Sequence, residues 1–557
     1  MPKEDHPDDA RQDRELPLTK KQETVTVQAG DDAIKYLKQH LGHPFINWIL
    51  ADPTDNLTQQ QNEVALIVAD FLRNHLSDQP EIPAGLAMSP LTQYNPQLGT
   101  TALNYLHRYV KQEPPTRPYE LGDDLLNALA DLAAESYGEL LIPSEMGLFT
   151  GSIMSPIGDR IVKAVNAEGI FPSTDDDQSG LRSVLVETSA GIATGFQIIF
   201  FGSGVLQAAW ELAKLKKPVP NLDELIEMLP TALRQARSLF RGDRTKVISL
   251  VALTGIQLPE GMEISGDWGR IRKARDEDHP PFLKQMVERR TSATTPEGDT
   301  VEITDAGDVI LETSVGMTMK VTQVFHEEIS ATTSTAEDVD KLVDRVRLAF
   351  SLAVSREHRP VLVSTWRRFI MPLSGGGISY NDPQHMAQRY PSVLSTKEAQ
   401  SWNEWIDRIE SIDINPLGVA VNRTLRAVSE RRDHSDMLID SVIAWESLLG
   451  ATSESVLRVS AALAKLLHPP GAVRNRARTR YKNIYTTRSK IVHGNNKARL
   501  TAEQIRQDAM EATDVALAAI RIMLVQQRQL LPLDSDERSL RILLDDMTHL
   551  DPLDSES

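Results

Sequence analysis

The sequence predicts a mainly α, multidomain protein with an N-terminal helical region, a small β-rich middle domain and a C-terminal helical bundle. Apolar residues recur at helical spacing within residues 26–240 and again in 336–355 and 401–530. Between these parts, residues 241–335 are rich in β-branched residues and are punctuated by turn sequences. At 557 residues the chain is long enough for three or four domains with sizeable cores.

Composition narrows the class of protein. The chain is 41% hydrophobic and 25% charged, which is typical of a soluble globular protein. It has no cysteine, which excludes disulfides and thiolate metal sites and suits a cytoplasmic location. The net charge of −18 argues against general attraction to nucleic acid. Residues 1–25 are charged and lack the apolar core of a signal peptide, so we expect a disordered arm there.

The N-terminal region, residues 26–240, contains two clear amphipathic patterns, which predict helices at 59–76 and 123–141. Residues 188–210 carry no charge and are long enough to span a bilayer. This segment also holds Gln197, Gln207 and four glycines, which lower its hydrophobicity. A buried helix or helix pair is therefore favoured over a membrane span, and a membrane-associated sensor stays as the alternative.

The middle of the chain changes character. Residues 245–258 and 308–322 predict strands, and the sequences PEG, SGDWG and TPEGDT predict the turns around them. Residues 336–400 are expected to form a helix followed by a Gly-rich linker. No Lys-Ser/Thr follows Gly375, Gly376 and Gly377, so a nucleotide-binding loop is not expected.

Residues 401–530 predict a bundle of six helices joined by short loops. Asn415 is the expected N-cap of the second helix, with Pro416 at its first position. Thr501 and Gln504 form a capping box for the last. The acidic tail, residues 531–557, is expected to be mobile or docked. The predicted helices lie at residues 402–412, 416–432, 437–449, 455–467, 474–493 and 502–527.

One part of this bundle is strongly basic. Between Ser455 and Ala502 there is no Asp or Glu, which makes this window a candidate polyanion site. The alternative is a solvated basic face. Eleven cations lie in the window: Arg458, Lys465, Arg474, Arg476, Arg478, Arg480, Lys482, Arg488, Lys490, Lys497 and Arg499.

Arg488 and His493 are the candidate catalytic residues within this window. Positions five apart on a straight helix point about 140° away from each other, so the two side chains do not share a face of an unbroken helix. Gly494 can end the helix in a left-handed conformation, which frees the imidazole to turn back toward the guanidinium. Arg272 and His279 match the same loose pattern, but three carboxylates and two prolines nearby predict a surface loop there.

The chemistry of this pair suits RNA. Arginine can clamp a phosphate with two hydrogen bonds and stabilise extra charge on it in the transition state. Histidine titrates near neutrality and can move a proton at the 2′-hydroxyl or at the leaving 5′-oxygen. Together they can cleave RNA without a metal or cofactor, because the ribose supplies the nucleophile. The alternative is that His493 only caps the end of the helix.

The sequences SDMLIDSVIAWESLLG (435–450) and YKNIYTTRSKIVHGNN (481–496) resemble the Apea-like branch of the HEPN superfamily. The resemblance covers residues 401–530 and implies a dimeric helical bundle, in many members a metal-independent ribonuclease of antiviral defence or toxin systems. The motif of that superfamily, Arg and then His after four to six residues, falls on Arg488 and His493. Ser489 supplies the polar residue that usually follows the arginine, although Asn, Asp or His is commoner there.

Glu446 projects from an apolar helical stripe and therefore needs a cationic partner. The resemblance implies that it orients Arg488, and a structural ion pair with Arg458 is the alternative. Tyr481 and Tyr485 share a helical stripe with Arg488. They are expected to be core or interface aromatics rather than platforms for stacked bases.

The sequence thus predicts a cytoplasmic endoribonuclease that works as a homodimer or higher oligomer, under an unknown trigger or regulatory partner. The alternative is a non-catalytic module that dimerises or binds RNA or a partner protein. Sequence motifs of P-loop nucleotide-binding proteins, HExxH metalloproteases and serine hydrolases are lacking. The predicted RNA-binding cations are Arg474, Arg476, Arg478, Arg480, Lys482 and Lys490.

Overall fold

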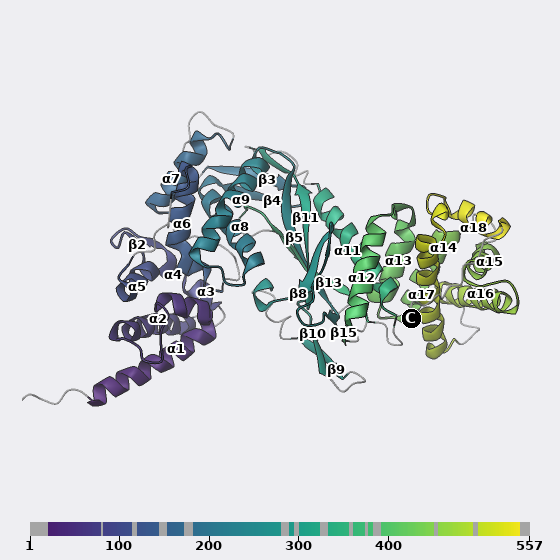
Figure 1. The fold of residues 1–557 in the computed structure, drawn as a ribbon, viewed down its shortest axis with the longest axis horizontal. Helices are drawn as coiled ribbons and strands as arrows, with labels where there is room; N and C mark the ends of the chain where they lie inside the picture. The colour runs from purple at the N-terminus through teal and green to yellow at the C-terminus, as the bar shows by residue number, and fades with distance from the viewer. Residues whose placement is uncertain are drawn as a thin grey trace, which may run out of the picture. The chain divides into compact units, whose positions relative to one another are not determined.

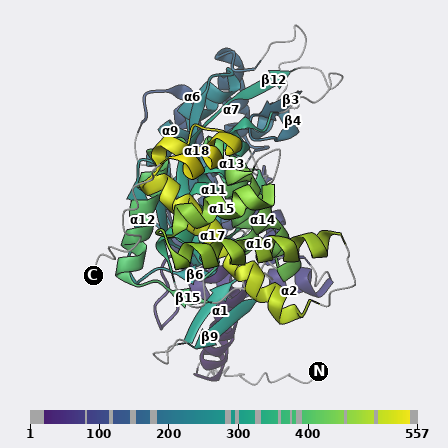
Figure 2. The same cartoon turned by 90° about the vertical axis from the view of Figure 1, so that its right-hand side faces the viewer.

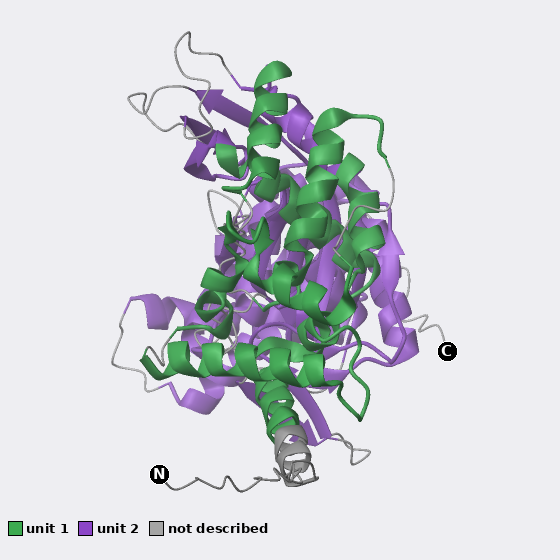
Figure 3. Ribbon diagram, turned by 90° about the vertical axis from the view of Figure 1, so that its left-hand side faces the viewer, with its two compact units in different colours: residues 1–168, 199–230 green, residues 169–198, 231–557 purple. Residues whose placement is uncertain are grey.

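The structure is a computed structural model, with 60% of its residues in helices and 16% in strands, which confirms the mainly α prediction. The chain divides into two compact units, residues 1–168 with 199–230 and residues 169–198 with 231–557 (Figure 3). The structure describes residues 20–78, 82–113, 120–143, 153–171, 182–279, 289–294, 300–322, 332–355, 360–373, 377–381, 391–450, 455–493 and 500–545.

Several predictions concern residues outside these ranges. They are residues 1–19 of the predicted arm, Gly375, Gly376, Gly494, Lys497, Arg499 and residues 546–557 of the tail. The arm was predicted to extend to residue 25, but helix α1 already begins at Lys20.

The first unit is built mainly from helices, with one short strand pair of β1 (Tyr94–Asn95) and β2 (Thr100–Thr101), and both helices predicted in it are present as α2 and α6. Asp123 begins α6 by accepting a hydrogen bond from the backbone N–H of Leu126, at 2.9 Å. Along α6 the buried residues include Leu125, Leu129 and Leu132, which is the helical repeat that the sequence shows. The main helices are α1 (Lys20–Ile49), α2 (Gln59–Asp78), α5 (Ala102–Lys111), α6 (Asp124–Leu140), α7 (Pro156–Ala167) and α8 (Phe201–Lys216).

Only the second half of the uncharged segment 188–210 is the buried helix that the sequence predicted. Strand β3 (Ser183–Thr188) ends in it, and β4 (Ala193–Gln197) follows after a tight turn. Only from Ile198 is the chain helical, through η1 (Ile198–Phe200) into α8. The helix Ile198–Lys216 is long and apolar enough to cross a membrane, but 61% of it is buried, as in the core helix of a globular protein.

The second unit is organised around a six-stranded antiparallel sheet with the strand order β14-β13-β5-β11-β8-β7 (Figure 1). Its two longest strands pair over nine residues, from Thr245 opposite Met317 to Leu253 opposite Val309. These are two of the strands that the sequence predicted. The strands are β5 (Thr245–Thr254), β7 (Ile264–Gly266), β8 (Gly269–Lys273), β11 (Val309–Met317), β13 (Val363–Ile370) and β14 (Ile378–Tyr380).

The predicted boundary of the β-rich domain at residue 335 is wrong. Strands β13 and β14 come from residues 336–400, which were expected to hold only a helix and a linker. Strand β13 pairs with β5, and Trp366 on β13 is buried and donates to the backbone oxygen of Ala306 at 2.7 Å. Because this pairing joins residues more than a hundred positions apart, no local sequence pattern announces it.

Smaller strand pairs complete the second unit. Strand β12 (Met319–Thr322) continues from β11 and pairs with β3, which makes a three-stranded sheet with β4. Strands β9 (Arg290–Thr294) and β10 (Thr300–Thr304) form a hairpin, and β6 (Ile256–Gln257) pairs with β15 (Ser392–Val393). Between β5 and β6, Gly255 has a φ of +116°, and a Cβ there would lie 1.9 Å from the backbone oxygen of Val361.

Helix α11 (Ser334–Ala353) packs against both the sheet and the C-terminal bundle, and the sequence predicted it correctly. Trp402 on α12 (Thr396–Glu410) donates its indole N–H to the backbone oxygen of Val346 at 3.0 Å and lies edge-on against Phe350. The buried Arg347 guanidinium donates to the Ser429 hydroxyl and, at 3.0 Å, to Glu430. The bundle therefore has no separate beginning at residue 401.

All six predicted bundle helices are present (Figure 2). The N-cap of the last is also confirmed, since Thr501 accepts from the backbone N–H of Gln504 at 3.1 Å. Asn415 is not an N-cap; it lies within the 3₁₀ turn η5 (Asn415–Leu417), and its backbone N–H donates to Asp413. Besides α12, the helices are α13 (Gly418–Ser429), α14 (His434–Leu449), α15 (Ser455–Leu467), α16 (Ala472–Val492) and α17 (Ala502–Val525).

The tail is docked on the bundle as far as residue 545, through helix α18 (Ser535–Leu544). Arg458 on α15 contacts Asp536 at 2.8 Å. Lys465, also on α15, donates to the backbone oxygens of Leu543 and Asp545. Two cations of the basic window are therefore occupied by the tail.

Candidate active site on helix α16

Helix α16 carries both candidate catalytic residues and has one buried stripe. Tyr481, Ile484 and Tyr485 on this stripe are buried, as expected from their spacing of three and four residues. The Tyr481 ring lies edge-on to Trp445 of α14, with centroids 5.7 Å apart. Its hydroxyl lies 2.8 Å from Nε2 of His468, and burial raises the pKa of Tyr481 to about 12. Both tyrosines are thus part of the bundle core, as predicted.

Glu446 of α14 lies beside Arg488, one of the two alternatives that the sequence left open. Its Oε2 is 3.9 Å from Nη2 of Arg488, and its Oε1 accepts a hydrogen bond from the Tyr485 hydroxyl. The other alternative is not formed, because the Arg458 guanidinium contacts Asp536 and Ser539 instead. Glu446 therefore connects α14 to two residues of α16 that are three positions apart.

The Tyr485–Glu446 contact fixes the protonation state of the tyrosine. Burial, then the hydrogen bond to Glu446, raise the pKa of Tyr485 well above its usual range. Tyr485 therefore remains a donor at every physiological pH, and it holds one oxygen of Glu446. The second oxygen is left facing Arg488.

Arg488 keeps most of its donor capacity. Its contact with Glu446 is longer than a hydrogen bond, and its Nε is shielded from solvent without a hydrogen-bond partner among the described residues. The side chain is 21% exposed, so it is partly open to solvent. A guanidinium held beside one carboxylate with unused N–H groups can donate two hydrogen bonds to a pair of phosphate oxygens.

His493 lies at the end of α16, close to where the sequence predicted that the helix stops. The last helical residue is Val492, and the backbone N–H of His493 donates to the Ser489 oxygen at 3.0 Å. The imidazole is exposed, and Ser489 is half-buried. The predicted part of Gly494 in ending the helix lies outside the described residues.

The structure does not join Arg488 to His493 within one chain. In the described part of the molecule, no hydrogen bond or other polar contact links the two side chains. Arg488 points toward α14, whereas His493 follows five residues later, about 7.5 Å further along the helix axis. The expected approach of the imidazole to the guanidinium, after a turn at Gly494, therefore stays a prediction.

The predicted RNA-binding cations fall into two groups. Arg476, Arg478 and Lys482 are exposed, and Lys490 is half-buried. The other two, Arg480 and Arg474, already contact groups of the bundle and are therefore less suited to contact RNA. Arg480 pairs with Asp508 at 2.6 Å and with Glu511 at 2.8 Å, and Arg474 donates to the His468 backbone oxygen at 2.9 Å.

The second match to the Arg–His pattern is not the surface loop that the sequence predicted. Arg272 lies on β8 and is only 5% exposed. Its guanidinium contacts Asp278 and Glu312, each at 2.6 Å. Asp278 was one of the carboxylates that suggested a surface loop, whereas it is buried as a partner of this arginine. All three groups are occupied by one another, which leaves no free guanidinium edge for a phosphate.

Comparison with known proteins found no similar protein: no family model, no curated protein and no solved structure matches the chain.

Proposed function

We propose that the C-terminal bundle is a metal-independent endoribonuclease of the HEPN type. The observation that carries this proposal is the Arg488 guanidinium, which lies beside Glu446 with unused donors, on the helix that ends at His493. Exposed cations of the same helix, Arg476, Arg478 and Lys482, can hold the RNA backbone. The setting we propose is the cytoplasm, in antiviral defence or a toxin-like stress response.

The proposed reaction uses the substrate's own nucleophile. His493 removes the proton of the ribose 2′-hydroxyl, and the 2′-oxygen attacks the adjacent phosphorus. The bond from phosphorus to the 5′-oxygen breaks, and that oxygen takes the proton from His493 and leaves as a hydroxyl. The products are a 2′,3′-cyclic phosphate and a 5′-hydroxyl. Arg488 stabilises the charge that builds up on the phosphate oxygens in the transition state.

A homodimer would allow the Arg488 guanidinium and the His493 imidazole to act on one phosphate although they are not in contact within one chain. In a two-fold arrangement the α16 helix ends of two copies face each other, so that a guanidinium of one copy can serve the same phosphate as an imidazole of the other. The N-terminal helical unit and the sheet would then respond to a trigger or hold the nuclease in check.

A second candidate function is a non-catalytic module that dimerises or binds RNA. The absence of a polar contact between Arg488 and His493 in the described part of the chain favours it. In this case the basic face of α16 binds RNA, and the RNA remains intact.

The test is cleavage of total RNA by the purified full chain, with and without EDTA, followed by analysis of the product ends. We expect cleavage that persists in EDTA and leaves a 2′,3′-cyclic phosphate. His493→Ala and Arg488→Ala should each lower the rate by about a hundred-fold or more. His434→Ala and Arg426→Ala change an exposed His and a half-exposed Arg elsewhere in the bundle and should leave the rate unchanged.

The outcomes separate the two candidates. Cleavage by His493→Ala at the wild-type rate would refute the catalytic role of this residue. Retention of RNA without any cleavage, by wild type and both variants alike, would support the binding module. A chain that neither binds nor cleaves RNA would end both proposals.

A further inference from the structure

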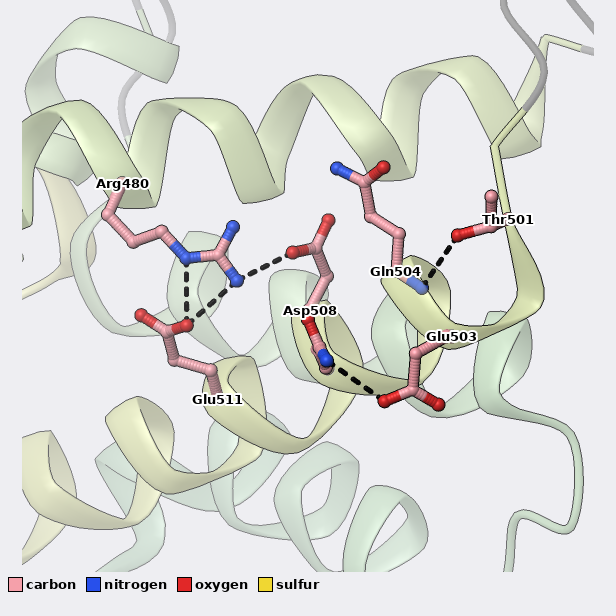
Figure 4. Close-up of a pocket in the computed structure, with 7 residues that line it drawn as sticks. Arg480, Thr501, Glu503, Gln504, Asp508 and Glu511 are labelled. Carbon is pink, nitrogen blue, oxygen red and sulfur yellow. Dashed lines mark hydrogen bonds and ion pairs between the residues drawn. The ribbon is translucent and has the colours of Figure 1, made fainter.

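A polar pocket lies between α16 and the first half of α17, in the most basic part of the chain. Its volume is about 610 Å³. Three of its side chains are carboxylates and one is a guanidinium, so the pocket is net negative although α16 itself is basic. The lining residues are Arg480, Thr501, Glu503, Gln504, Gln507, Asp508 and Glu511 (Figure 4).

Asp508 is the unusual group in this pocket. The residue is 1% exposed, and its Oδ1 pairs with Nη2 of Arg480 at 2.6 Å. Its Oδ2 is shielded from solvent and has no hydrogen-bond partner among the described residues. Figure 4 shows the Asp508 carboxylate directed from α17 toward α16, between the side chains of Arg480 and Gln504. Buried carboxylate oxygens normally have a donor, so this one indicates a missing partner.

A cation with N–H groups suits this carboxylate oxygen best. Arg480 does not fill this role, because its guanidinium is already shared between Asp508 and Glu511. An anion is disfavoured by three carboxylates against one guanidinium. A metal ion is also disfavoured, since no group of three or more carboxylates or imidazoles in the described ranges is arranged to hold one. An ammonium group carries both the charge and the donors that Asp508 lacks.

The spacing of the carboxylates favours several ammonium groups in a row. Glu503, Asp508 and Glu511 line the same pocket, with rises of about 7.5 Å and then about 4.5 Å between them along the axis of α17. Glu503 also contacts Arg506 at 3.4 Å and accepts a hydrogen bond from Gln507, and its side chain is 60% exposed, so it can take a further donor. The carbonyl oxygens of Gln504 and Gln507 lie among them as further acceptors. Ammonium groups joined by short methylene chains match such a line of acceptors.

We propose that the pocket between α16 and α17 binds a linear oligoamine, with one ammonium group on Asp508 and others on Glu503 and Glu511. Binding supplies the donor that Oδ2 of Asp508 lacks and neutralises the excess negative charge of the pocket. Neither Arg488 nor His493 lines this pocket, and the proposal does not depend on nuclease activity.

The test measures binding of spermidine to the full chain by calorimetry and by thermal unfolding. We expect spermidine in large excess over its dissociation constant to raise Tm by several degrees, because a ligand that binds only the folded state stabilises it. Asp508→Asn should weaken binding by about tenfold or more, since the ammonium loses a charged acceptor.

A second variant covers the case in which Asp508→Asn fails to fold. Gln504→Lys places an ammonium four residues before Asp508, on the side where its free oxygen lies. This tethered amine should raise Tm by itself and abolish the response to spermidine. Gln400→Lys makes the same charge change at an exposed position of α12, and it should retain the response of the wild type.

Three results would overturn the proposal. The first is an equal rise in Tm with magnesium chloride at matched ionic strength, which would mean charge screening alone. The second is an undiminished spermidine response in both Asp508→Asn and Gln504→Lys. The third is a Tm that ignores spermidine but rises with protein concentration, which would indicate that a cationic side chain of a second copy fills the pocket.

Discussion

Replacement of Arg538 should detach the C-terminal helix from the bundle. Arg538 lies on α18 and is 2% exposed, and burial lowers the pKa of its guanidinium, which nonetheless stays charged. All its hydrogen bonds in the described structure go to backbone oxygens rather than to a carboxylate. These oxygens belong to Pro416, Ser447, Leu448, Leu530 and Leu531, at distances of 3.0 to 3.4 Å.

The cost of Arg538→Met can be bounded from these contacts. A hydrogen bond that involves a charged group contributes about 1.5 to 3 kcal/mol, but the five values are not additive, because the variant also removes a buried charge. The backbone oxygens lose their donor, at about 1 to 3 kcal/mol for each buried group left unsatisfied, and the loss is partly offset because a charge is no longer buried, so a net loss of about 3 kcal/mol is expected. Arg541, three residues along α18, is 57% exposed and contacts only Asp545 in the described part. Arg541→Met should change stability by no more than about 0.5 kcal/mol.

Urea unfolding followed by circular dichroism compares the two variants, and limited proteolysis detects release of the tail. Arg538→Met should unfold at a lower urea concentration and lose its C-terminal fragment earlier than both wild type and Arg541→Met. Equal midpoints and equal protease resistance for the two methionine variants would refute the structural role assigned to Arg538.

Three further changes have expected outcomes. Arg272→Ala leaves Asp278 and Glu312 buried without their cation, so thermal unfolding should show a loss of about 3 to 5 kcal/mol, and a surface-like effect would contradict this. Burial raises the pKa of Glu139 from 4.5 to about 8, so the folded state holds a proton that the unfolded state releases. Stability of the first unit should therefore fall as pH rises from about 5 to about 8, and Glu139→Gln should flatten this dependence in pH-dependent unfolding. Gly255→Ala, at a φ of +116° and against a backbone oxygen, should cost more than about 1 kcal/mol in urea unfolding, and an unchanged midpoint would be evidence against that strain.

Local patterns predicted the helices and failed where pairing is distant. The periodicity in residues 123–141 and 455–467 is a property of each segment alone, so α6 and α15 were found within a few residues of their ends. Strand β4 was missed because an uncharged apolar run does not distinguish a buried strand from a buried helix. Strand β13 was missed because its partner β5 is remote in the sequence.

The candidate site shows the same division. Glu446 was identified from a carboxylate on an apolar stripe, and it lies beside Arg488. The Tyr485 hydrogen bond to Glu446 was not predicted, although the spacing of Tyr485 and Arg488 places both on one side of α16 and is a signal that was available. The pairing of Arg480 with α17 was not predicted, because its partners Asp508 and Glu511 lie outside the basic window of residues 455–502.

The C-terminal bundle buries part of its surface against α11 on one side and α18 on the other, so it is not an independent domain. The predicted bundle spans residues 401–530, yet Trp402 packs against Phe350 of α11, and Arg538 of α18 donates to the backbone oxygens of Leu448 at the end of α14 and of Pro416 in η5. A fragment cut at these two borders would expose an indole and lose the buried guanidinium. Helix α11 in turn contacts the sheet, since Arg367 of β13 donates to the backbone oxygen of Ala336 at 3.1 Å. The bundle is therefore not expected to fold when it is transferred alone into another protein. A chimaera that contains it has to include the sheet as well.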